Sequence, residues 1–151
     1  MSLLTPEMKS AIGRSLPPVT EEVTRREVRK YAVATGQRLE KYLRGDEAPP
    51  MFLYGLFRDI LQAERLLPDG RPPDSGLLPD LPLKRVMAGG TEATYHRRIH
   101  AGDVLVATQT LVDLFEKEGS QGPLIFAVVE HQVKTKAGEP VMTERVTRIA
   151  R

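Results

Sequence analysis

The sequence contains no cysteine among its 151 residues. This absence excludes disulfide bonds, thiolate-ligated metals and cysteine nucleophiles, and it fits a reducing cytoplasm. Aromatic residues make up only 5% of the chain and no long run of lysine or arginine occurs, so the net charge of +2 does not indicate a nucleic-acid partner. The start lacks the basic segment and long apolar run of a secretory signal, and we expect no membrane partner.

What is present is an ordinary globular composition, with 40% hydrophobic and 28% charged residues. The length is that of one domain, and no internal repeat divides it, so we expect residues 1–151 to form a single domain. The mildly basic balance suits a small ligand that bears phosphate.

The segment 48–63 predicts one buried helix. Pro49 and Pro50 open it, and proline at a first helical position has no amide proton to leave unpaired. Apolar side chains then cover most of the helical circumference until Arg58 and Asp59, which is typical of a helix that other elements enclose. Phe115 and Phe126, in later strand-like segments, are expected to cover it.

Shorter helices are expected before this segment. Thr5 precedes Pro6 as a helix cap, and Thr24 with Glu27 forms a capping box that starts a helix ending at Gly36. The second helix carries basic residues on its other faces, either as a solvated surface or as a contact for an anionic ligand: Arg25, Arg26, Arg29 and Lys30.

The second half of the chain is rich in strand signals. Residues 66–84 form a long loop with five prolines, which is either a lid or disordered. Strands are predicted over 89–99, 104–115, 124–133 and 141–149, with short turns between the last three, as in an antiparallel meander. Helices packed on one face of such a sheet give an α+β fold. An antiparallel sheet wrapped around one long buried helix is the hot-dog fold.

Six short segments occur in an order that resembles the MaoC-like hydratase/dehydratase family, in its fatty-acid-synthase-type dehydratase branch: 28–36, 48–52, 89–92, 101–105, 122–126 and 136–139. The resemblance implies a single hot-dog domain and (R)-specific hydration of an enoyl thioester. The acyl group is carried on coenzyme A or acyl carrier protein as substrate, with no further cofactor. It also implies a second hot-dog subunit that joins its sheet to this one, in a homodimer, heterodimer or tetramer.

Active members of that family carry an Asp and a His in the motif Gly-Asp-x-Asn-Pro-x-His. Here Gln37 stands where the Asp is expected, no Asn-Pro follows, and no histidine occurs before His96. An amide is not a base at neutral pH, so the catalytic residues are unknown. We therefore expect the non-catalytic half of a hydratase whose partner carries the Asp/His pair. The alternatives are an acyl-thioester binding module, or an active homo-oligomeric hydratase or thioesterase that uses Glu40, Asp46 or Glu47.

The resemblance also places substrate-binding positions beside the thioester groove: Gln37, Pro49, Pro50, Met51, Tyr54, Gly89 and Gly90. The prolines alternatively mark a plain helix start, the glycines a plain bulge, and Tyr54 a core residue.

The three histidines and the charged residues near them are candidates for chemical roles. His96 and His100 would share one face of a strand, but no third ligand has suitable spacing, so we expect no metal site. His131 alternates with apolar residues and is interpreted as a sheet histidine rather than a base. Asp103 is expected to organise a turn, and Arg97 and Arg98 either contact coenzyme A phosphates or lie on a solvated strand edge.

Overall fold

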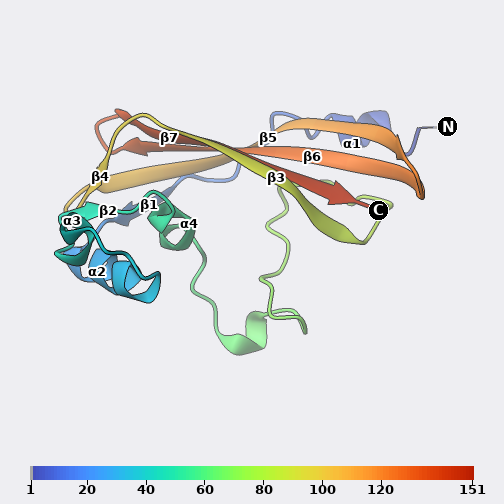
Figure 1. The fold of residues 1–151 in the computed structure, drawn as a ribbon. Helices are drawn as coiled ribbons and strands as arrows, with labels where there is room; N and C mark the ends of the chain where they lie inside the picture. Colours follow the sequence, from blue (N-terminus) through green and yellow to red (C-terminus); the bar gives the residue numbers. More distant parts are fainter. Residues whose placement is uncertain (1) are drawn as a thin grey trace.

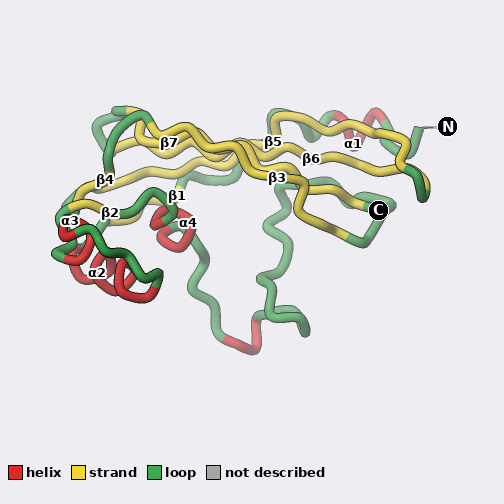
Figure 2. Tube along the Cα trace, in the orientation of Figure 1, coloured by secondary structure: helices red, strands yellow, loops and turns green. Residues whose placement is uncertain are grey.

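The structure is a computed structural model that describes residues 2–151. Its largest element is a five-stranded antiparallel sheet in the order β1-β5-β6-β7-β3, with small helices at its two ends (Figures 1 and 2). The strands are β1 (Val19–Glu22), β3 (Val86–Tyr95), β5 (Val104–Gly119), β6 (Gly122–Thr135) and β7 (Pro140–Ala150). A second, two-stranded sheet joins β2 (Glu47–Ala48) to β4 (Ile99–His100).

The long hairpin of β5 and β6 fixes the register of the sheet. Gly119 pairs with Gly122 across a two-residue turn, and Gly122 has a φ of 119°, which glycine adopts without steric cost. Apolar residues at every second position of β6 are buried and define the inner face of the sheet: Ile125, Ala127, Val129 and Val133. The residues between them define the outer face.

The helices are short. They are α1 (Pro6–Lys9), α2 (Arg25–Ala34), α3 (Glu40–Leu43) and α4 (Phe52–Leu56), with a 3₁₀ turn at Ala63–Arg65. The predicted start of α2 is confirmed, because the Thr24 hydroxyl accepts a hydrogen bond from the Glu27 backbone N–H at 3.2 Å. The same hydroxyl donates to the Glu27 carboxylate at 2.7 Å, in place of the second bond of a capping box. Val28 and Ala32 are the buried face of this helix.

The predicted long buried helix over 48–63 is wrong in its extent. Helix α4 has five residues, of which only Phe52 and Leu53 are buried, and Ile60 is fully exposed at 102%. Gly55 lies in the middle of the segment, no side chain caps its start, and Arg58 and Asp59 interrupt the apolar run. Phe115 and Phe126 do not cover it either, since they stack on each other on the outer face with centroids 5.0 Å apart.

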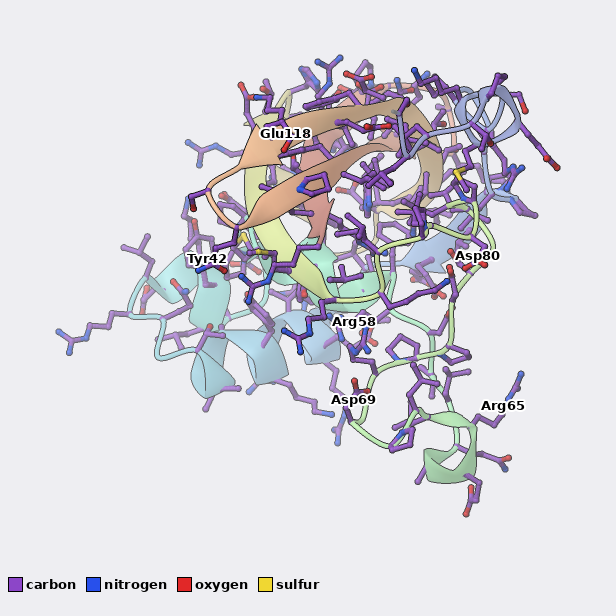
Figure 3. The ribbon with its side chains drawn as sticks, turned by 90° about the vertical axis from the view of Figure 1, so that its right-hand side faces the viewer. Tyr42, Arg58, Arg65, Asp69, Asp80 and Glu118 are labelled. Atoms are coloured by element: carbon purple, nitrogen blue, oxygen red, sulfur yellow. The ribbon has the colours of Figure 1, made fainter. Side chains whose placement is uncertain are left out.

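After α4 the chain leaves the sheet and returns to it at β3; we call residues 58–84 the arm (Figure 1). Figure 3 shows Arg65 and Asp69 away from the sheet, whereas Asp80 lies where the arm returns. The predicted loop over 66–84 is confirmed, because that part of the chain contains no helix or strand. Leu77 of the arm is buried, with 2% of its surface exposed.

The core consists of two separate apolar clusters on the inner face. The first lies under α2 and α4 and includes Phe52, Leu105, Val133 and Met142. The second lies at the opposite end of the long strands, where α1 and the returning arm cover Leu111, Val129 and Ile125. Between the two clusters the inner face carries polar side chains, described below.

Candidate functional site

The turn after α2 holds Gln37, the position at which the resemblance requires a catalytic Asp. Gly36 has a φ of 68°, and the Gln37 N–H donates to the Ala32 carbonyl at 2.9 Å, which ends the helix. The Gln37 amide lies 3.5 Å from the Thr35 hydroxyl, which is its only side-chain contact among the described hydrogen bonds. The sequence therefore positions a neutral amide at this turn.

The acidic side chains considered as alternative bases, Glu40, Asp46 and Glu47, all form ion pairs. Asp46 accepts hydrogen bonds from Arg25 and from Arg44, the latter at 3.0 Å. These bonds hold the pKa of Asp46 below its ordinary value, and the hydrogen bond from Arg25 has the largest effect. Glu40 is exposed on α3 and lies 3.7 Å from the Arg44 guanidinium.

Glu47 is paired in the same way from the short strand β2. Its burial raises the pKa, but hydrogen bonds from Lys41 at 2.8 Å and Arg98 at 3.1 Å outweigh this effect, so the pKa of Glu47 is lowered. A carboxylate with a lowered pKa is a weaker base at neutral pH. Asp46 and Glu47 are therefore arranged as structural ion pairs.

The start of α4 is tied to the last residue of β3. The Tyr95 hydroxyl donates to the Pro50 carbonyl at 2.8 Å. Burial, with smaller effects of Glu144 and Tyr31, raises the pKa of Tyr95, so this hydroxyl keeps its proton. Pro49 is buried, whereas Met51 is 55% and Tyr54 is 61% exposed. The structure therefore presents Met51 and Tyr54 at the surface beside this junction.

Gly89 and Gly90 lie further back along β3, at a bulge opposite β7. A Cβ at Gly89 would lie 2.8 Å from Cγ1 of Ile149, and Gly90 has a φ of 126°. The close approach at this pair is therefore to β7 on the outer face. The structure does not place these glycines beside the Tyr95–Pro50 contact.

Asp103 organises the turn into β5, as predicted, by accepting a hydrogen bond from the His100 backbone N–H at 2.8 Å. It also receives two bonds from Arg97, both at 3.3 Å, and Glu139 lies 3.6 Å from the same guanidinium. Two carboxylates therefore compete with any phosphate for Arg97.

His96 and His100 do not share a strand, because a bend separates β3 from β4. The His96 ring lies 3.0 Å from the Thr143 hydroxyl. Within residues 2–151, no group of three or more His, Cys, Asp or Glu side chains is arranged to hold a metal.

A polar row on the inner face was not singled out from the sequence. It consists of Gln109, His131 and Glu144, which are consecutive cross-strand partners on β5, β6 and β7. His131 Nδ1 lies 3.6 Å from a Glu144 carboxylate oxygen, and the side chains are 29% and 13% exposed. The alternation of His131 with Val129 and Val133 is the sequence signal that places it inward.

A family model described as "FAS1-like, dehydratase domain region" matches residues 10–144. The chain belongs to this family. A FAS1-like dehydratase domain is what the resemblance to the fatty-acid-synthase-type branch implies, and that prediction is confirmed.

Two curated relatives of this FAS1-like dehydratase domain are informative. A "UPF0336 protein" of Saccharopolyspora erythraea is 30% identical over 149 residues, which cover 95% of this chain and 90% of that protein. The "Mesaconyl-C(4)-CoA hydratase" of Chloroflexus aurantiacus is 27% identical over 85 residues, which are 56% of this chain but only 30% of that protein.

Solved structures confirm the hot-dog fold. The ChsH1-ChsH2 complex from Mycobacterium tuberculosis matches with a TM-score of 0.70 and 19% identity, over 95% of this chain and 86% of that chain. A MaoC-like dehydratase from Rhodospirillum rubrum matches with a TM-score of 0.58 and 15% identity, over 92% and 91%. The domain is thus an α+β hot-dog domain of the FAS1-like dehydratase family. No helix within residues 2–151 is long and apolar enough to cross a membrane.

Proposed function

We propose that this chain is the non-catalytic half of an (R)-specific enoyl-thioester hydratase or 3-hydroxyacyl-thioester dehydratase. It completes the acyl-binding groove of a partner subunit that carries the Asp/His pair. The observation that supports this proposal is the neutral Gln37 at the turn after α2.

The chemistry needs two groups that this turn lacks. A base must take a proton from water as it adds to the β-carbon, and an acid must protonate the α-carbon. Gln37 does neither, and two of the carboxylates considered as alternatives, Asp46 and Glu47, have lowered pKa values because arginine and lysine side chains donate to them. These ion pairs also count against the alternative of an active enzyme that uses Asp46 or Glu47.

The free edge of the sheet supports a second subunit. All ten residues of β3 are exposed, and β3 is the last strand in the sheet. Unpaired backbone groups on an edge strand are a template for pairing with another chain. The ChsH1-ChsH2 structure is itself a complex of two named components. We propose a hot-dog partner that adds its own sheet at β3.

The ligand we propose is an acyl thioester carried on coenzyme A or acyl carrier protein. Helix α2 presents exposed basic side chains that suit its phosphates: Arg26, Arg29 and Lys30. Pro50, Met51 and Tyr54, near the Tyr95 contact, remain our candidates for lining the thioester groove.

The test is an assay of the purified chain with crotonyl-CoA, followed by loss of the conjugated enoyl absorbance. We expect no turnover by the chain alone, and turnover when a hot-dog subunit bearing the Asp/His motif is added. Gln37→Ala should leave kcat of the reconstituted complex within about twofold, because the amide performs no proton transfer, whereas loss of its predicted contact with the substrate would raise KM. Robust turnover by the chain alone would end the proposal, and Asp46→Asn and Glu47→Gln would then identify the base.

A further inference from the structure

The polar row of Gln109, His131 and Glu144 lies where an apolar interior is expected. Gln109 pairs with His131, and His131 pairs with Glu144, so the three side chains stand side by side across three strands. Their neighbours along the strands on the same face are apolar: Val129 and Leu111 belong to one core cluster, and Val133 and Met142 to the other.

The row is partly exposed to solvent, since 29% of the His131 side chain and 13% of the Glu144 side chain are accessible. Helix α4 ends at Leu56, and the arm leaves the sheet before it comes back to it ahead of β3 (Figure 1). Apolar residues of α4 pack against the first cluster, and those of the returning arm, including Leu77, pack against the second. The row lies on the inner face between the strand residues of these two clusters.

The His131 and Glu144 side chains do not hydrogen-bond to each other, and their polar atoms are not sealed from solvent. Glu144 contacts His131 at 3.6 Å, which is too long for a hydrogen bond, and burial is the only influence on the raised pKa of its carboxyl group. Burial, with a smaller effect of Arg148, lowers the pKa of His131. Tyr95, the other titratable group near Glu144, has its hydroxyl bonded to Pro50. The row therefore offers hydrogen-bond donors and acceptors to a ligand.

We propose that the row binds a hydroxyl group on the acyl chain of the thioester, beyond the reacting carbons. This inference rests on the proposed function and specifies its substrate class. A hydroxyl both donates and accepts, which matches an imidazole, a carboxyl and an amide in one row. Ala107 and Val146, the partly exposed apolar neighbours of the row on the same face, suit the hydrocarbon on either side, whereas a carboxylate on the acyl chain would meet the acidic Glu144.

The experiment compares binding of dodecanoyl-CoA with a series of dodecanoyl-CoA thioesters, each bearing one hydroxyl at a different carbon beyond the β-carbon. Isothermal titration calorimetry on the complex of this chain with the Asp/His-bearing subunit gives the dissociation constants. We expect one position of the hydroxyl to bind about tenfold tighter than dodecanoyl-CoA, which corresponds to about 1.4 kcal/mol. His131→Leu and Glu144→Leu should abolish that preference, and Glu144→Gln, which still forms hydrogen bonds, should retain it.

The outer face provides a matched control on the same strands. Glu130 is adjacent to His131 but points outward, where it accepts hydrogen bonds from Gln132 and Arg145 at 2.9 Å each. Glu130→Leu should leave the preference unchanged. If every hydroxylated ligand binds as dodecanoyl-CoA does, the inference about the row is overturned and the acyl-binding role stands. If no acyl-CoA binds, both the inference about the row and the proposed acyl-binding role are wrong.

Discussion

Glu144 and His131 face each other on the inner side of the sheet, and burial shifts their pKa values in opposite directions. The pKa of Glu144 is raised and that of His131 is lowered, so the neutral form of each is favoured. One strand position away, the pKa of Glu130 is lowered, because Gln132 and Arg145 donate hydrogen bonds to its carboxylate. The two glutamates therefore make opposite contributions to the pH dependence of stability.

Replacing each glutamate by glutamine tests these signs. The contribution of Glu144 is complete below the ordinary pKa of 4.5 and is lost as pH rises through its higher folded value. Glu144→Gln should therefore gain stability relative to the wild type between about pH 4 and pH 7. The contribution of Glu130 is complete above the ordinary pKa of 4.5 and is lost as pH falls through its lower folded value, so Glu130→Gln should lose stability relative to the wild type as pH rises from about 2 to about 5. Urea unfolding at a series of pH values measures the free energy of unfolding of both variants. If their stability relative to the wild type changed with pH in the same direction, the opposite pKa shifts of Glu144 and Glu130 would be wrong.

Single residues could be predicted from the sequence where their role is local. Asp103 follows Gly102 and organises a turn, and Thr24 caps the helix that begins after it. The pairing of His131 with Glu144 could not be predicted in this way, because 12 positions and a turn separate them and their contact depends on strand register. The sequence shows that His131 points inward but not what it faces.

At the scale of elements, the arm is the main departure from the predicted fold. The same apolar residues that predict a long buried helix form a short helix and an extended segment here. Apolar composition shows that a segment needs a partner, but it does not show whether that partner lies within the chain. Leu77 is the point at which the arm is anchored to the second core cluster.

Truncation of the Leu77 side chain tests whether the arm is anchored to the second core cluster. Leu77→Ala should lower the free energy of unfolding by about 2–4 kcal/mol, because it removes a buried side chain from a packed cluster. Ile60→Ala is the matched control on the same arm, and its fully exposed side chain should change stability by less than about 0.5 kcal/mol. Urea denaturation of the purified chain measures both. Equal effects of the two substitutions would show that the arm is not anchored at Leu77.

The strands could be predicted better than the helices. Alternation over 104–115, 124–133 and 141–149 corresponds to β5, β6 and β7, each a few residues longer in the structure. The predicted strand 89–99 is instead divided into β3 and β4 by the bend at residues 96–98. Strand β1 was missed because its residues are all exposed and show no alternation of apolar and polar side chains.

At the scale of the whole molecule, the sheet has one covered and one open edge. The edge of β5 that faces away from β6 is covered, because strand β1 pairs with it and Thr110 of β5 forms a bridge with Ser15. At the opposite edge, β3 pairs only with β7. The His96 N–H donates to the Val141 carbonyl of β7 at 2.9 Å. Backbone N–H groups along an antiparallel strand point alternately to one side and the other. The Thr94 N–H therefore also points to β7, and the Ala93 N–H points to the open edge.

Proline substitutions at Ala93 and Thr94 test whether the open edge is needed for association without being needed for folding. Ala93→Pro removes an N–H that faces the open edge, so it should yield a folded monomer where the wild-type chain associates. Thr94→Pro removes a bond of the internal ladder and should lower the melting temperature. Sedimentation velocity and thermal unfolding measure the two effects. Association of Ala93→Pro as strong as that of the wild type would place the contact elsewhere.

The two apolar clusters have a consequence for how the molecule opens. They share three long strands but are covered by different, short segments, and the polar row lies between them. Loosening of α4 at one end does not require α1 or the returning arm to detach at the other. Local unfolding at either end can therefore leave the backbone ladder of the three long strands intact.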